Sequence, residues 1–177
     1  MSKQYWSEEL AWAVADGAAV ANTASETIIF PNVTVPANYM ADGRTLRLRV
    51  FGKLSTTATP TMIWRLRWGG VAGTLLALSE TLTMGSGVAN VNWDLELYIQ
   101  TRTNGATGTL IVMGVLRVHT AAGTVLINVW GVSGFDAPAA VTVDLTADTA
   151  LSLTAQWGTA SASNTLTGLM YHLESLN

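Results

Sequence analysis

Strict alternation of apolar and polar residues runs through three segments of this chain and constrains its fold more than any other feature. Side chains point to opposite faces of a β-strand in turn, so alternation predicts strands with one face buried and one face polar. The three segments, each with the charged residues of its polar face, are Leu46–Val50 with Arg47 and Arg49, Ile63–Trp68 with Arg65 and Arg67, and Trp93–Ile99 with Asp94 and Glu96.

Further strands are predicted along most of the chain, separated by turn signals rich in glycine and asparagine. No helical period is found after residue 17, which favours an all-β fold, a sandwich or a barrel of about eight to ten strands. The chain of 177 residues is long enough for one core, so we expect an N-terminal arm (1–16) and a single domain (17–177). The further predicted strands are Thr109–His119, Thr124–Trp130, Val141–Leu145, Ala150–Trp157 and Leu166–Leu173, with one or two within Ala18–Phe30 and one near Val33–Val35.

Charged residues are scarce in this chain. They make up 12% of it, about half the usual share for a soluble domain. A protein packed against copies of itself can cover its surface with Thr, Ser, Asn and Ala, so the scarcity favours an assembly; a secreted bacterial β-sandwich is the alternative. The net charge of −3 predicts no nucleic-acid partner, and the lack of cysteine excludes disulfides and thiolate chemistry.

The first residues carry a group of aromatic side chains, and a free arm would leave these large apolar rings exposed to water. Tyr5, Trp6 and Trp12 flank Ser7, which could cap one helical turn, and the rings would either fold back on the body or anchor a neighbouring molecule. This segment does not resemble a secretory signal, and no apolar run reaches the length of a membrane span. We therefore expect assembly in the cytoplasm and no membrane partner.

No catalytic, cofactor-binding or metal-binding set is predicted. The two histidines, His119 and His172, lie far apart in the sequence, and an ordinary surface role is expected for each. Asp94 and Glu96 share a strand face, as the paired carboxylates of a glycosidase would. Cross-strand ion pairs with the arginines of the alternating segments are the stronger explanation. Four tryptophans fall at inward positions and are predicted to lie in the core: Trp64, Trp68, Trp93 and Trp157.

Several short segments together resemble a group of phage and prophage structural proteins. They cover most of the chain beyond the arm, and they are Asp16–Thr23, Glu26-Thr27, Phe30-Pro31, Val35–Asn38, Gly43–Arg47, Gly52–Ser55, Gly134–Asp136, Val143–Leu145 and His172–Asn177. The resemblance implies a jelly-roll β-sandwich similar to that of tumour-necrosis-factor-like trimers, displayed on a virion and without catalytic residues.

Two functions follow from that resemblance. The first is a capsid decoration (cement) protein, which would form a homotrimer on the capsid surface and stabilise contacts between subunits of the major capsid protein. The alternative is a fibre-tip or receptor-binding domain of the phage tail. Self-association or capsid binding would use interface candidates from the arm and the charged strand faces: Tyr5, Trp6, Trp12, Arg47, Arg49, Arg65, Arg67, Asp94 and Glu96.

Overall fold

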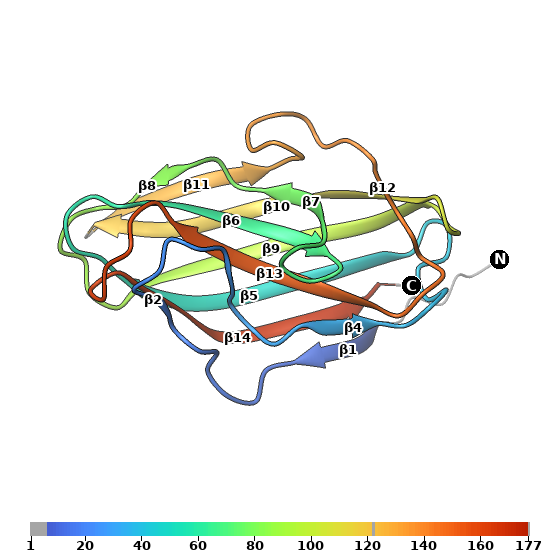
Figure 1. Cartoon of the computed structure of the whole chain (residues 1–177), viewed down its shortest axis with the longest axis horizontal. Helices are drawn as coiled ribbons and strands as arrows, with labels where there is room; N and C mark the ends of the chain where they lie inside the picture. The colour runs from blue at the N-terminus through green and yellow to red at the C-terminus, as the bar shows by residue number, and fades with distance from the viewer. Residues whose placement is uncertain (1–6, 122, 177) are drawn as a thin grey trace.

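Two antiparallel β-sheets packed face to face form the molecule (Figure 1). The computed structural model describes residues 7–121 and 123–176. In spatial order the larger sheet contains β1 (Glu8–Trp12), β14 (Thr165–Ser175), β5 (Thr45–Ser55), β9 (Val91–Thr103), β10 (Gly108–Ala121) and β11 (Thr124–Trp130), with β2 (Val20–Ala21) beside β14 and β12 (Val141–Val143) beside β10.

The smaller sheet lies across the larger one, in front of it in the view of Figure 1. Its strands are β3 (Thr27–Ile28), β13 (Thr149–Trp157), β6 (Thr61–Trp68) and β7 (Thr74–Leu78), with β4 (Val33–Val35) beside β13 and β8 (Leu82–Thr83) beside β6. The chain crosses between the sheets after β2, β4, β5, β8, β12 and β13. The predicted all-β jelly-roll sandwich is confirmed, and the alternating segments lie in β5, β6 and β9.

The core lies between the inner faces of the two sheets. Burial alternates residue by residue along β5, β6 and β9, as the sequence pattern predicts. Trp64, Trp68, Trp93 and Trp157 are all buried, and the rings of Trp64 and Trp93 pack at a tilt with centroids 6.2 Å apart. The prediction that these four rings belong to the core is confirmed.

The N-terminal segment forms an edge strand, so the helical turn predicted at Ser7 is wrong. Glu8–Trp12 pair with the last strand, β14. Beyond β1, the Ala13 amide donates to the Tyr171 carbonyl at 3.1 Å. The free edge of β14 offers backbone partners that an isolated helical turn cannot match. Tyr5 and Trp6 lie outside the described residues, and the division of the chain at residue 16 stays a prediction.

The six charged residues of the alternating segments do not share one sheet face, which corrects the ion-pair network expected from the sequence. Arg65 and Arg67 lie on β6 in the smaller sheet, where both pair with Glu26. The other four lie on the outer face of the larger sheet. The alternation predicts which side chains of a strand point inward, but it does not show to which of the two sheets that strand belongs.

Two glycines face each other across β5 and β14 and admit large rings close to the backbone. Gly52 and Gly168 are register partners. A Cβ on Gly52 would lie 2.3 Å from the Thr167 carbonyl oxygen and 2.5 Å from the Trp93 ring, and one on Gly168 would lie 2.3 Å from the Phe30 ring. These positions therefore require glycine for space.

We expect Gly52→Ala to lower the free energy of unfolding by about 1–3 kcal/mol, because the added methyl group overpacks a rigid site. Urea unfolding followed by tryptophan fluorescence measures the change. Gly87→Ala is the comparison, since a Cβ there meets open space and the cost is only that of a positive φ in a turn. Equal stability of the wild type and Gly52→Ala would contradict this account of the close approach.

Candidate functional site

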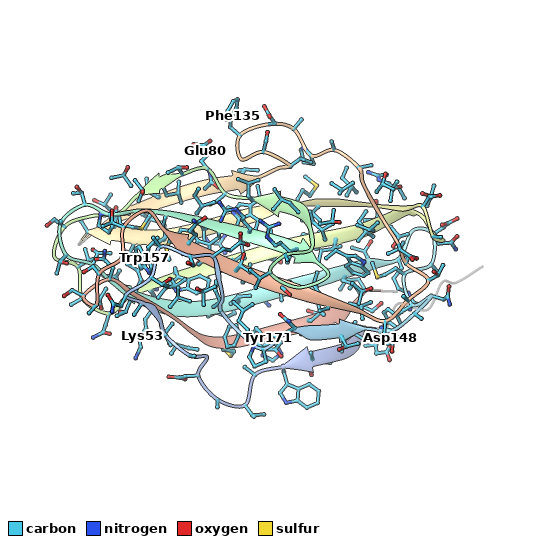
Figure 2. The ribbon with its side chains drawn as sticks, in the orientation of Figure 1. Lys53, Glu80, Phe135, Asp148, Trp157 and Tyr171 are labelled. Atoms are coloured by element: carbon cyan, nitrogen blue, oxygen red, sulfur yellow. The ribbon has the colours of Figure 1, made fainter. Side chains whose placement is uncertain are left out.

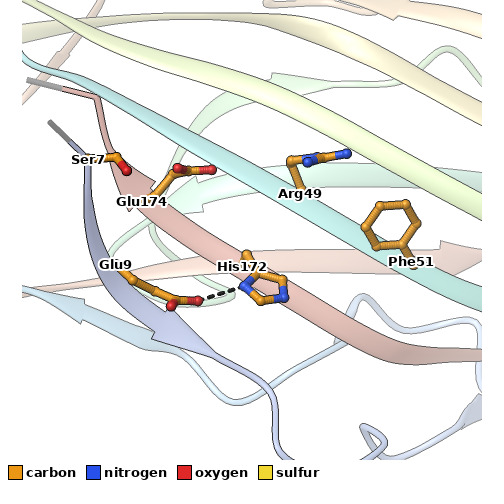
Figure 3. Close-up of a pocket in the computed structure, with 6 residues that line it drawn as sticks. All are labelled: Ser7, Glu9, Arg49, Phe51, His172 and Glu174. Atoms are coloured by element: carbon orange, nitrogen blue, oxygen red, sulfur yellow. Dashed lines mark hydrogen bonds and ion pairs between the residues drawn. The ribbon is translucent and has the colours of Figure 1, made fainter. Parts of the chain in front are cut away.

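A hollow of about 420 Å³ opens on the outer face of the larger sheet, where β1, β14 and β5 run side by side (Figure 3). Ionisable side chains dominate its lining, with one aromatic ring among them. The lining residues are Ser7, Glu9, Arg49, Phe51, His172 and Glu174.

Strand register brings these residues together from distant parts of the sequence. Arg49 and Phe51 are two residues apart on β5, and His172 and Glu174 are two apart on β14, so each pair shares one face of its strand. His172 lies opposite Arg49, and Glu9 of β1 lies opposite Glu174. The site thus needs the N-terminal strand in place.

Each of the two carboxylates of the hollow contacts a basic side chain. Glu9 and Glu174 are cross-strand neighbours, an arrangement that repels when both are charged. Each has a basic partner: the Glu9 Oε1 atom lies 2.6 Å from His172 Nδ1, and Arg47 donates from Nε to Glu174 Oε1 at 2.8 Å. The hydrogen bond with Glu174 raises the pKa of Arg47 and outweighs the opposing effect of burial. These pairs fix both carboxylates along the rim.

Arg49 and Phe51 supply an exposed cation and a ring face. The Arg49 guanidinium carbon lies 5.7 Å from the centre of the Phe51 ring, within cation–π range. Figure 3 shows both side chains beside the Glu9–His172 pair. Binding sites for drug-like molecules are mostly apolar, whereas this hollow offers one apolar ring surrounded by donors and acceptors. That combination suits a polar ligand with many hydroxyl groups.

The interface candidates predicted from the sequence fall into separate places. Arg49 lines the hollow, and Arg47 lies beside it through its pair with Glu174. Asp94 accepts from Arg117, not from the predicted arginines, and Glu96 accepts a hydrogen bond from the Tyr98 hydroxyl at 2.9 Å. Their roles as an interface stay predictions, as do those of Tyr5, Trp6 and the half-exposed Trp12.

Sequence reasoning missed Phe51, Glu9, Glu174 and the site role of His172. Phe51 follows Arg47 and Arg49 at the same two-residue spacing, so the alternation could have placed it on the same outward face. Nothing local in the sequence marks the other three, because they meet Arg49 only through the pairing of β1, β14 and β5.

Residues 7–121 and 123–176 contain no cluster of three or more His, Asp or Glu side chains placed to hold a metal ion. No helix within those ranges is long and apolar enough to span a membrane.

The fold and the hollow together define a β-sandwich with an open polar face. Comparisons with models of known families and with curated proteins gave no match. Among solved structures, the chain is similar to the CBM2 module of the evolved Dit protein of Lactobacillus casei BL23 phage J-1, with 10% identity, 99% of this chain and 98% of that chain covered, and a TM-score of 0.38. It is also similar to winged bean acidic lectin bound to methyl-α-D-galactose, with 7% identity, 98% and 99% covered, and a TM-score of 0.31.

Proposed function

We propose that this chain is a structural protein of a tailed-phage particle, in its tail fibre or tip, and that its open polar face binds a glycan of the host surface. The observation that carries the proposal is the hollow of about 420 Å³ in which Phe51 lies among Arg49, His172 and two glutamates. The proposal is therefore the receptor-binding alternative and not capsid decoration.

The chemistry of the hollow supports a sugar as its ligand. The C–H groups of a sugar ring can pack on the Phe51 ring, and its hydroxyl groups can bond to carboxylate and guanidinium groups at once. Glu9 and Glu174 already have basic partners, so their carboxylate oxygens are oriented before a ligand arrives. Preorganised groups of this kind lower the entropy lost on binding.

The sequence supports the phage assignment independently of the hollow. The motif resemblance to phage structural proteins covers most of the chain, and the low charge suits a protein that functions within a large assembly. The absence of a catalytic role stays a prediction.

Phe51→Ala should weaken glycan binding about tenfold, because it removes the ring against which a sugar packs. A tenfold change corresponds to about 1.4 kcal/mol, within the range for loss of one aromatic contact. Biolayer interferometry of the full chain against purified cell-wall polysaccharides and a panel of neutral and acidic oligosaccharides measures the affinity.

Phe135→Ala is the matched control. Phe135 is 81% exposed on the loop after β11, away from the hollow, and Figure 2 shows it at the opposite margin of the molecule from Tyr171 of β14. This variant should bind as the wild type does. Failure of the wild type to bind any glycan in the panel, or equal binding by Phe51→Ala, would refute the proposal.

Capsid decoration remains the second candidate, favoured by the resemblance and the low charge. It predicts many copies distributed over the head, a homotrimer and contact with the major capsid protein. Quantitative mass spectrometry of purified particles separates the two functions, since a tail component is present in few copies. Abundant copies on tail-less heads would favour decoration.

A further inference from the structure

The outer face of β11 is apolar and exposed. Val125, Ile127 and Val129 alternate along this strand with exposed fractions of 42%, 67% and 63%. Met113 and Val115 of the adjacent strand β10 continue the apolar surface, and Val115 lies directly opposite Val129. Exposed large apolar groups are ordinary when scattered, but a contiguous set on one strand marks an interaction site.

The same strand is an edge of its sheet. Over the described residues β11 pairs along its length with β10 alone. On its other side the segment after β7 contacts it through an isolated bridge between Leu78 and Gly131 and a hydrogen bond of 3.2 Å from the Glu80 amide to Asn128 Oδ1. Natural proteins protect such edges with charges, proline or bulges. The opposite edge of the sheet, β1, carries Glu8 and Glu9, whereas Thr124–Trp130 has no charge and no proline.

The positive charge on the outer face next to β11 is already paired. The nearest cation on the outer face is Arg117, opposite Ile127, and Asp94 neutralises it through a hydrogen bond of 3.0 Å to Arg117 Nε. The outer face therefore brings no unpaired cation from Arg117 to the seam, and the exposed Glu80 beside Asn128 is the charged side chain that a second copy has to accommodate. In an antiparallel pair centred near Ile127, Val125 of each copy would face Val129 of the other, so the apolar set is complementary to itself.

We propose that two copies of this chain pair through β11, edge to edge around a two-fold axis, and continue the larger sheet across the dimer. The proposal holds whether or not the polar hollow binds a glycan. A seven-residue strand is about 24 Å long, so the paired edge is small beside standard interfaces of about 1,600 Å². A contact of that size predicts a weak, reversible dimer.

Sedimentation equilibrium over a range of concentrations tests the assembly. We expect a shift from the 18.7 kDa chain towards twice that mass. Ile127→Lys should raise the dissociation constant at least tenfold, because the two-fold axis places the two introduced charges opposite each other. Val71→Lys, the same kind of change at an exposed apolar residue of the β6–β7 turn, should leave it unchanged.

Amide hydrogen exchange of the wild type distinguishes edge pairing from other contacts and needs no variant to fold. Amides of Thr124–Trp130 that point away from β10 should become protected as the concentration rises, since a second strand would accept their hydrogen bonds. A wild type that stays monomeric at high concentration, a trimer, or a dimer without this protection would each overturn the proposal. Because glycan binding is measured separately, failure here leaves the proposed function untouched.

Discussion

Trp157→Ala lowers the free energy of unfolding by about 3–5 kcal/mol, the largest effect we expect from a single substitution in this chain. The indole is fully buried between the sheets, and its Nε1 donates to the Val20 carbonyl at 3.0 Å. The change opens a cavity and also leaves that carbonyl without its donor. The measurement is urea unfolding, followed by the negative circular dichroism band that β-strands give near 218 nm.

Trp12→Ala is the matched control for this prediction. The Trp12 ring is 55% exposed at the end of β1, so its removal should cost less than about 1 kcal/mol. Similar losses for the two variants would mean that the core does not depend on the packing of Trp157.

Glu26→Gln lowers the free energy of unfolding at pH 7 by about 2–3 kcal/mol, because it removes the shared negative partner of two partly buried arginines. Glu26 accepts from Arg67 Nε at 2.5 Å and Arg67 Nη2 at 2.8 Å, and Arg65 Nη1 lies 3.5 Å away. Thr154 donates to the same carboxylate at 2.5 Å. Both arginine head groups and the carboxylate are largely shielded from water, so the loss exceeds that of a surface ion pair.

The same variant changes how stability depends on pH. Burial by itself raises the pKa of Glu26, but the hydrogen bonds from Arg67 and Thr154 and the charges of both arginines outweigh it and hold the pKa below its ordinary value of 4.5. A carboxyl with a lowered folded-state pKa stabilises the fold above its unfolded pKa and loses that effect as the pH falls through the folded value. The difference between the wild type and Glu26→Gln should therefore be full at pH 7 and shrink below about pH 4.

Unfolding curves at a series of pH values measure this difference. Glu80→Gln makes the same chemical change at an exposed residue and should stay within about 0.5 kcal/mol of the wild type throughout. A difference between the wild type and Glu26→Gln that is independent of pH would show that the carboxylate charge is not what stabilises this cluster.

Local pattern predicted the strands and the core, but the candidate site depends on pairing between distant segments. Alternation alone placed Trp64 and Trp93 inward and Arg49 outward, because the two-residue period belongs to a single strand. Neither the assignment of Arg65 to the other sheet nor the meeting of His172 with Arg49 has a local signal. Both are set by which strands become neighbours, and that is decided by packing over the whole chain.

The N-terminal strand is a second case in which local sequence preference does not predict the structure. Ser7 followed by two glutamates is a reasonable start for a helix by local preference. In the folded chain, Tyr39 donates to Glu8 at 2.8 Å and the backbone pairs with β14. Tertiary contacts override a weak local preference in so short a segment.

The polar hollow and the bare edge strand β11 lie on the same sheet, and the hollow opens on the face that carries the exposed side chains of β11. In a dimer joined at β11, nine strand spacings of about 4.8 Å would separate the two copies of β14, so two hollows would lie roughly 40 Å apart along a shared sheet whose twist turns one hollow relative to the other. Such a pair would engage a repeating polymer at two points at once. The avidity gained would let a weak individual contact hold a particle to a surface while each contact still exchanges rapidly.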